Sequence, residues 1–119
     1  MRIDIRGRNV EITDELREMV RKRFQRLGRQ VSALATLDVV LSEERNPSIA
    51  DSQVAEATFY LKGVTLRARE CSPEMTHSVR DLAEDVRRQV KKHRELQRKR
   101  SKTRHRVDEM RGRPAEAHP

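Results

Sequence analysis

The sequence predicts an α+β domain of element order β-α-β-β-β-α, in which two helices pack on one face of a four-stranded mixed sheet. Four segments carry apolar residues at every second position, the pattern of strands buried on one side. Two others carry them at three- and four-residue steps, the pattern of helices with one buried side. Since each strand has only one apolar set, both helices must cover the same face of the sheet and leave the other face polar.

The first strand is predicted over residues 1–6. Ile3 and Ile5 face one way, and charged residues alternate with them. Gly7 and Asn9 then interrupt the pattern, so we expect the strand to end before them.

A helix is predicted next, from Asp14 to about Leu27. Thr13 supplies a hydroxyl that accepts from free backbone amides at the helix start, and Gly28 is a residue type that ends helices. The positions expected to be buried are Leu16, Val20, Phe24 and Leu27. Basic residues occupy the flanks, at Arg17, Arg21, Lys22, Arg26 and Arg29.

Three more strands are predicted over residues 37–43, 53–62 and 64–70. Their inward positions are expected to be Leu37, Val39, Leu41, Ala55, Ala57, Phe59, Leu61, Leu66 and Ala68. Residues 44–51 have no period and are typical of a mobile loop, while Lys62 and Gly63 form a tight turn. The first two strands are expected to be parallel, joined by a right-handed crossover, and the later strands antiparallel.

The last predicted element is a long helix from Ser72 to about Arg100. Ser72 and Pro73 are typical of a helix start. Its apolar side carries Met75, Val79, Leu82, Ala83, Val86 and Val90. Its opposite side is mostly cationic, with Arg80, Arg87, Arg88, Lys91, Lys92, Arg94 and Arg98. Two basic helices side by side on a sheet would join their outer sides into one positively charged surface.

The 119 residues suffice for one domain, which we place at residues 1–97. Residues 98–119 lose the apolar period, are strongly cationic and contain Gly112 and Pro114. We interpret them as a basic, disordered tail or linker, and a direct contact with RNA is compatible with either.

The charge balance indicates an anionic partner. There are 27 Lys and Arg against 19 Asp and Glu, a formal net charge of +8 and a pI near 10.5, which favours nucleic acid or an anionic membrane surface. No apolar run is long enough to span a membrane, and the N-terminus does not have the layout of a signal peptide. Cys71 is the only cysteine, which excludes an intrachain disulfide. We therefore expect a cytoplasmic protein with no membrane partner.

Catalysis finds little support in the sequence. Cys71 and His77 lack a third group to orient them, the four histidines lack the spacing of metal ligands, and no glycine-rich phosphate loop follows a strand. We expect no enzyme activity, metal, cofactor or small-molecule substrate. Phe24, Phe59 and Tyr60 are too few for a single-strand stacking platform, which leaves recognition of structured RNA by shape and phosphate contact.

Residues 3–17, from Ile3 through Thr13 to Arg17, resemble the opening of the ribosome hibernation promoting factor family, also called the ribosome-associated inhibitor A or sigma-54 modulation protein family. Further resemblances, in the family's order, lie at Val39–Ser42, Ala55–Thr58 with Lys62-Gly63, and Arg88–His93. The resemblance covers about residues 1–96 and implies the β-α-β-β-β-α fold.

The resemblance also implies a function. Members of that family bind the small ribosomal subunit and its rRNA where messenger and transfer RNA would lie, and they inhibit translation under stress or in stationary phase. Carried over by position, the RNA-binding residues would be Arg21, Lys22, Arg26, Arg29, Arg88, Lys91, Lys92 and Arg94. This chain has Thr76 where the family commonly has an aromatic residue. Long members carry a second, dimerising domain, so we interpret this chain as a short form or an N-terminal domain, with a homodimer possible only through that missing domain.

Two other functions stay open from the sequence. The fold also resembles the double-stranded RNA-binding domain, so the chain could be a free-standing structured-RNA binder. That class places a basic motif at the start of its last helix, whereas Pro73, Glu74 and Met75 carry none. The chain could also be a protein-interaction module that modulates transcription.

Overall fold

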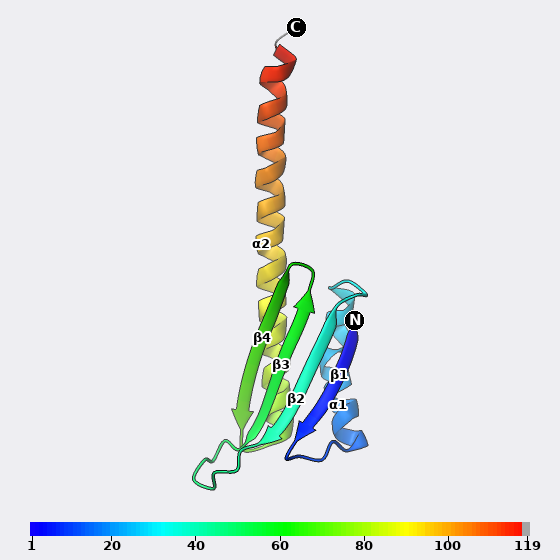
Figure 1. The fold of residues 1–119 in the computed structure, drawn as a ribbon, viewed down its shortest axis with the longest axis vertical. Coiled ribbons are helices and arrows are strands. Elements are labelled where there is room, and N and C mark those ends of the chain that lie inside the picture. Colours follow the sequence, from blue (N-terminus) through cyan, green and yellow to red (C-terminus); the bar gives the residue numbers. More distant parts are fainter. Residues whose placement is uncertain (118–119) are drawn as a thin grey trace. The chain divides into compact units, whose positions relative to one another are not determined.

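The structure is a computed structural model that describes the backbone of residues 1–117 and the side chains of residues 1–103. Figure 1 shows the predicted element order β-α-β-β-β-α, which is confirmed. The elements are β1 (Arg2–Arg8), α1 (Asp14–Phe24), the 3-10 helix η1 (Gln25–Arg29), β2 (Thr36–Glu43), β3 (Gln53–Leu61), β4 (Val64–Ser72) and α2 (Met75–Ala117). They form two compact units, Met1–Arg88 and Gln89–Pro119, whose boundary lies within α2.

The four strands form one mixed sheet in the order β1-β2-β3-β4. β1 runs parallel to β2, and β3 is antiparallel to both β2 and β4, as predicted. The register aligns Ile5, Val39, Ala57 and Ala68 in one row across the sheet. Alternation then puts the predicted apolar set of every strand on a single face.

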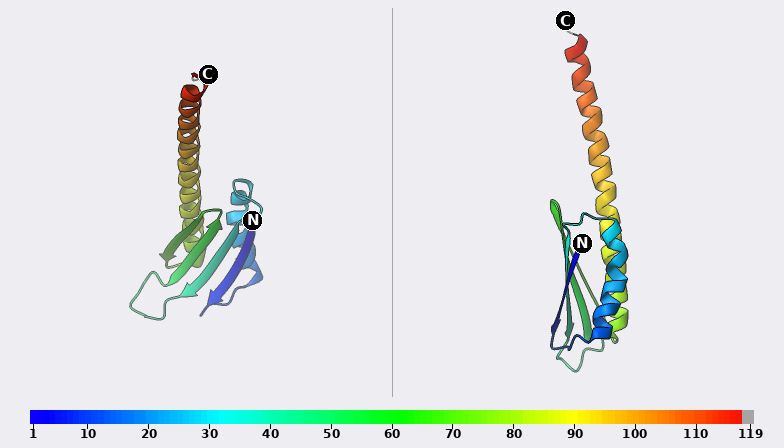
Figure 2. Two further views of the ribbon diagram at one scale, coloured as in Figure 1. Left: turned by 45° about the horizontal axis from the view of Figure 1, so that its top comes forward. Right: turned by 90° about the vertical axis from the view of Figure 1, so that its right-hand side faces the viewer.

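In the first unit, α1 and residues 75–88 of α2 cover that face, and the opposite face is open (Figure 2). The layer between helices and sheet is fully apolar at its centre, where Phe24, Leu37, Phe59 and Leu82 are 1% exposed or less. Val90, further along α2, is also buried. Burial differs from the prediction at Val54, which lies on the polar side of the alternation yet is only 4% exposed, and at Leu16, which was expected to be buried and is half-buried.

β1 continues through Gly7 to Arg8, two residues beyond its predicted end. A side chain at position 7 would collide with the backbone carbonyl oxygen of Val10 and would come 2.9 Å from Cγ1 of Ile12. Glycine is therefore required by a close approach and not by a turn. The turn comes at Asn9, whose φ is 62°, a value that asparagine tolerates better than most residues.

The start of α1 is as predicted, because the Thr13 hydroxyl accepts a hydrogen bond from the Leu16 amide at 3.1 Å. Its end differs. The α-helix stops at Phe24, and η1 carries the chain on to Arg29 with Gly28 inside it. Leu27 is buried from this tighter helix, so its predicted role in the core is confirmed.

The long helix also starts and ends elsewhere than predicted. β4 extends to Ser72, whose hydroxyl accepts from the Glu74 amide at 3.3 Å, and α2 begins at Met75. The helix then runs to Ala117, past the expected end near Arg100. Residues 97–111 are rich in Arg and Lys, which favour helix by intrinsic propensity and need no buried face to do so. The helix was predicted from its repeating apolar residues, which mark only the part that packs on the sheet. The extension lacks such a repeat and was therefore not predicted.

Candidate nucleic-acid interface

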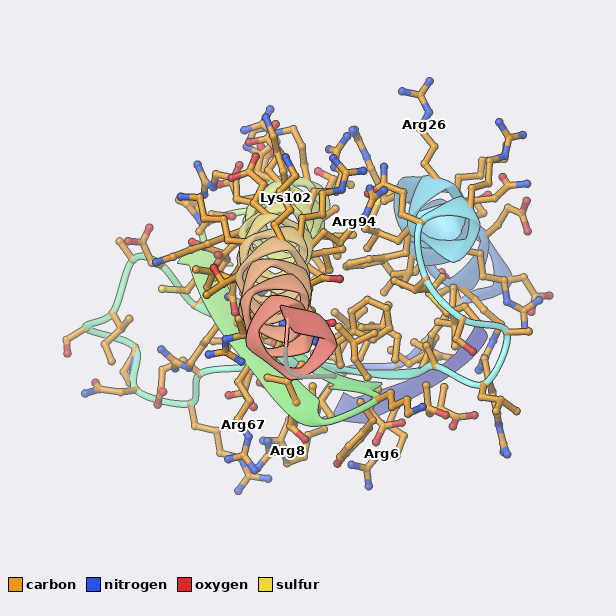
Figure 3. The ribbon with its side chains drawn as sticks, turned by 90° about the horizontal axis from the view of Figure 1, so that it is seen from above. Arg6, Arg8, Arg26, Arg67, Arg94 and Lys102 are labelled. Atoms are coloured by element: carbon orange, nitrogen blue, oxygen red, sulfur yellow. The ribbon has the colours of Figure 1, made fainter. Side chains whose placement is uncertain are left out.

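A groove of about 670 Å³ separates α1 from the first part of α2 in the first unit. Its lining residues are Glu15, Glu18, Met19, Lys22, Arg23 and Arg26 of α1 and Arg87 of α2. The side chain of Arg26 points away from the sheet (Figure 3). The groove therefore opens among cations carried by two helices on the outer side of the helical layer.

The helical repeat explains why these cations meet. Lys22 and Arg26 are one turn apart and project in nearly the same direction. On α2, Arg87 follows the buried residues Ala83 and Val86, and its Nε donates to the carbonyl oxygen of Ala83 at 3.4 Å. Packing of both helices on the sheet thus fixes the backbone positions of Lys22, Arg26 and Arg87. Their charged ends extend toward solvent.

The charge of the groove changes along α1. Glu15 and Glu18 lie toward the helix start, whereas Lys22, Arg23 and Arg26 lie toward its end. Carboxylates near the N-terminus and cations near the C-terminus both suit the helix dipole. A polyanion is therefore attracted to the half of the groove formed by Lys22, Arg23, Arg26 and Arg87.

The predicted residues of the first basic helix do not all share this groove. Lys22 and Arg26 line it, while Arg21 lines a second hollow of about 460 Å³ on the other flank of α1. Lys22 reaches both hollows. Arg29 is exposed on η1 and is not among the residues that line either one.

The predicted residues on α2 fall on different sides of that helix. Arg88 is exposed and is the last residue of the first unit. Lys91, Lys92 and Arg94 are exposed in the second unit. Within α2 itself, Arg94 lies seven residues after Arg87 and shares its side, whereas Lys92 lies seven residues after Asp85. The structure therefore divides a set that the sequence treated as one cationic row.

Arg88 also has acidic neighbours within the first unit. Burial raises the pKa of Glu70 above its ordinary value, the carboxylates of Asp85 and Asp81 raise it further, and the Arg88 guanidinium lowers it. Glu70 lies on the helix-facing side of β4, opposite Ala55 of β3. The carboxylates of Glu70, Asp81 and Asp85 and the Arg88 guanidinium therefore lie between β4 and α2. Arg88 thus interacts electrostatically with the carboxylate of Glu70 in the same domain.

Two groove residues, Arg23 and Arg87, were not predicted as site residues. A signal for Arg87 exists, since Arg80, Arg87 and Arg94 recur at seven-residue steps along one side of the last helix. No such signal marks Arg23, because its flank of α1 becomes part of a groove only when α2 packs beside it. Among the residues that the structure describes, no three His, Cys, Asp or Glu side chains could hold a metal ion. No helix in this part of the chain is long and apolar enough to cross a membrane.

Comparison with known proteins is consistent with this geometry. Residues 3–98 match the model of the family described as sigma 54 modulation protein / S30EA ribosomal protein. A ribosome hibernation promoting factor of Acinetobacter guillouiae is 29% identical over 102 residues, which cover 82% of this chain and 90% of that protein. A ribosome hibernation promotion factor of Picosynechococcus sp. is 30% identical over 96 residues, 80% of this chain but only 50% of that protein. The crystal structure of the Thermus thermophilus Protein Y N-terminal domain superposes with a TM-score of 0.68 at 30% identity, covering 78% of this chain and 99% of that one.

Proposed function

Because the chain belongs to the sigma 54 modulation protein / S30EA ribosomal protein family, we propose that it is a ribosome hibernation factor. It binds the small ribosomal subunit through rRNA near the sites of messenger and transfer RNA. Occupancy of those sites inhibits translation under stress or in stationary phase. The role requires binding alone and no catalysis, and it places the protein in the cytoplasm with the ribosomes.

The observation that carries this proposal is the cationic groove. Lys22, Arg26 and Arg87 project from two helices whose positions are fixed by a shared apolar core. Binding of a phosphate backbone along them releases condensed counterions, which contributes favourably to the affinity for RNA. Since packed helices hold the backbone of these residues in place, binding has to order only the exposed side chains.

We place the binding contacts of the ribosome-binding domain, residues 1–97, at Lys22 and Arg26, and we add Arg23 and Arg87. Arg21, Arg29, Arg88, Lys91, Lys92 and Arg94 stay predictions as further phosphate contacts. Residues 98–119 form a basic extension that adds electrostatic attraction. Of its described side chains, Arg98, Lys99, Arg100 and Lys102 are exposed, as such a role requires (Lys102 is labelled in Figure 3).

Co-sedimentation tests the proposal. The full chain is mixed with purified small subunits, large subunits, transfer RNA or an RNA duplex of matched nucleotide concentration. The proposal requires saturable binding to small subunits that survives an excess of duplex competitor. It also requires inhibition of a cell-free translation reaction at the concentrations that saturate the subunits. Equal affinity for the duplex would instead identify a general structured-RNA binder.

A further inference from the structure

The open face of the sheet carries five arginines, all on the two edge strands. Alternation places Arg2, Arg6 and Arg8 of β1 and Arg67 and Arg69 of β4 on this face. Figure 3 shows Arg6, Arg8 and Arg67 projecting from the side of the sheet opposite to Arg26. The carboxylates of the same face are Asp4, Asp38 and Glu56. This surface is therefore positively charged and separate from the groove between the helices.

The choice of arginine indicates what the charge is for. Charges on edge strands often prevent sheets from pairing with one another, and lysine is the usual residue for that purpose. Among the described strand residues of this face, every cation is an arginine. The planar guanidinium binds phosphate through two parallel hydrogen bonds and stacks on flat rings, which an ammonium group does not do. The composition of the face thus fits a nucleic acid better than protection of an edge.

Glu56 orients two of these arginines from opposite edges of the sheet. Its carboxylate lies 3.8 Å from Nη2 of Arg8 and 3.3 Å from Nε of Arg69. Both arginines remain more than half exposed, at 67% and 58%. Exposed ion pairs of this kind contribute little to stability. Their effect is to hold two guanidinium groups over the middle strands, with one negative charge between them.

Tyr60 adds an aromatic ring to the same face. It is 46% exposed, and its cross-strand neighbours are Thr36 and Thr65, whose small side chains leave the ring uncovered. Arg67 lies two residues after Thr65 on the same side of β4. A base stacked on the ring would thus have a guanidinium beside it for the adjacent phosphate. Exposed sheets with aromatic residues bind unpaired RNA in this way, with little dependence on base identity.

We propose that the open sheet face is a second RNA-binding surface, which takes an unpaired RNA segment with one base on Tyr60 and phosphates along the edge arginines. A single exposed ring holds a single base, so this surface departs from the sequence-based expectation that the chain recognises structured RNA only. The surface shares no residue with the groove. The inference therefore stands independently of the proposed function.

The amino-acid composition provides a direct test. Tyr60 is the only tyrosine and the chain has no tryptophan, so intrinsic fluorescence reports on this face alone. The full chain is titrated at low salt with a single-stranded uridine oligonucleotide of about eight nucleotides, within the usual site size of such proteins. The proposal requires saturable quenching. The pair Arg6→Gln with Arg67→Gln should weaken it by about tenfold through lost phosphate contacts.

The matched control removes two charges from the other surface, as Arg26→Gln with Arg87→Gln. This pair should leave the quenching nearly unchanged while lowering co-sedimentation with small subunits. Thermal melts establish that both double variants are folded. The inference is overturned if the wild-type chain shows no quenching, if both pairs weaken it equally, or if a polyglutamate peptide quenches as strongly as the RNA. Each of these results leaves the ribosome-binding measurement free to succeed or fail separately.

Discussion

The hydroxyl oxygen of Ser78 lies 2.6 Å from the backbone carbonyl oxygen of Gln53 and donates a hydrogen bond to it. Ser78 is completely buried in α2, and Gln53 is the first residue of β3. The same hydroxyl lies 2.7 Å from that of Ser72 at the end of β4. One side chain thereby ties the first turn of α2 to the ends of two strands.

Ser78→Ala should lower the free energy of unfolding by about 1–3 kcal/mol, because the carbonyl of Gln53 and the hydroxyl of Ser72 each lose a partner in a part-buried place. Chemical denaturation with an unchanged m-value would measure this loss. Ser101→Ala, at an exposed position of α2, is the control and should change stability by less than about 0.5 kcal/mol. Equal effects of the two substitutions would contradict the structural role of Ser78.

Glu70→Gln should stabilise the protein at neutral pH. Burial and the carboxylates of Asp85 and Asp81 raise the pKa of Glu70 above its ordinary value of 4.5. The folded state then binds the proton more readily than the unfolded state, so this group's contribution to stability falls as the pH rises from about the unfolded pKa through the folded one. The neutral glutamine removes that loss.

Denaturant unfolding of the wild type and the Gln variant at pH 4 and pH 7.5 checks the sign. The difference between the two proteins should be small at the lower pH, where Glu70 is largely protonated in both states. It should favour the variant at the higher pH. A variant that is less stable than the wild type at pH 7.5 would contradict the assignment.

Leu82→Ala should separate stability from binding. Leu82 is fully buried, so its truncation should cost about 2–5 kcal/mol by opening a cavity between helix and sheet. It is not among the residues that line the groove. Molecules that remain folded should therefore bind small subunits with nearly the wild-type affinity, as measured by co-sedimentation corrected for the folded fraction. A large loss of affinity per folded molecule would show that the core also sets the geometry of the interface.

Deletion of residues 97–119 should weaken binding to small subunits and reduce its salt dependence, because each lost phosphate contact removes about 0.7–0.9 from the slope of log affinity against log salt. The domain should still melt cooperatively, since every buried apolar residue found in the described side chains precedes Leu96. Loss of the melting transition would show that the basic extension belongs to the folded domain.

The sequence predicted the elements with a local cause. Alternation at Ile3 and Ile5 or at Leu37, Val39 and Leu41 needs no knowledge of the partner strands, and the cap at Thr13 acts within one helical turn. The parallel pairing of the first two strands and the antiparallel pairing of the later ones followed from these patterns and the crossover rule. The fold class could therefore be predicted in full.

The features that were not predicted depend on contacts between distant segments, or, like the extension of α2 past Arg100, involve residues without an apolar repeat. Gly7 stays in β1 because of its approach to Val10, which no strand pattern encodes. Arg21 and Lys22 are neighbours in sequence, yet they project about 100° apart on α1, and only the packed position of α2 decides which flank forms the groove. The resemblance carried Lys22 and Arg26 over by position, whereas nothing in the sequence marked Arg23 as a further residue that lines the groove.

The measurement that tests the central claim most directly is the affinity of small ribosomal subunits for a variant with the groove reversed in charge. Arg26→Glu with Arg87→Glu keeps the buried residues and puts two anions where phosphates should bind. The matched control, Arg45→Glu with Lys62→Glu, reverses two exposed cations outside the groove. The groove pair should lower the affinity by about two orders of magnitude at moderate salt, and the control by far less, with both proteins folded. A groove variant that still binds subunits and inhibits translation at the wild-type concentration would contradict the account.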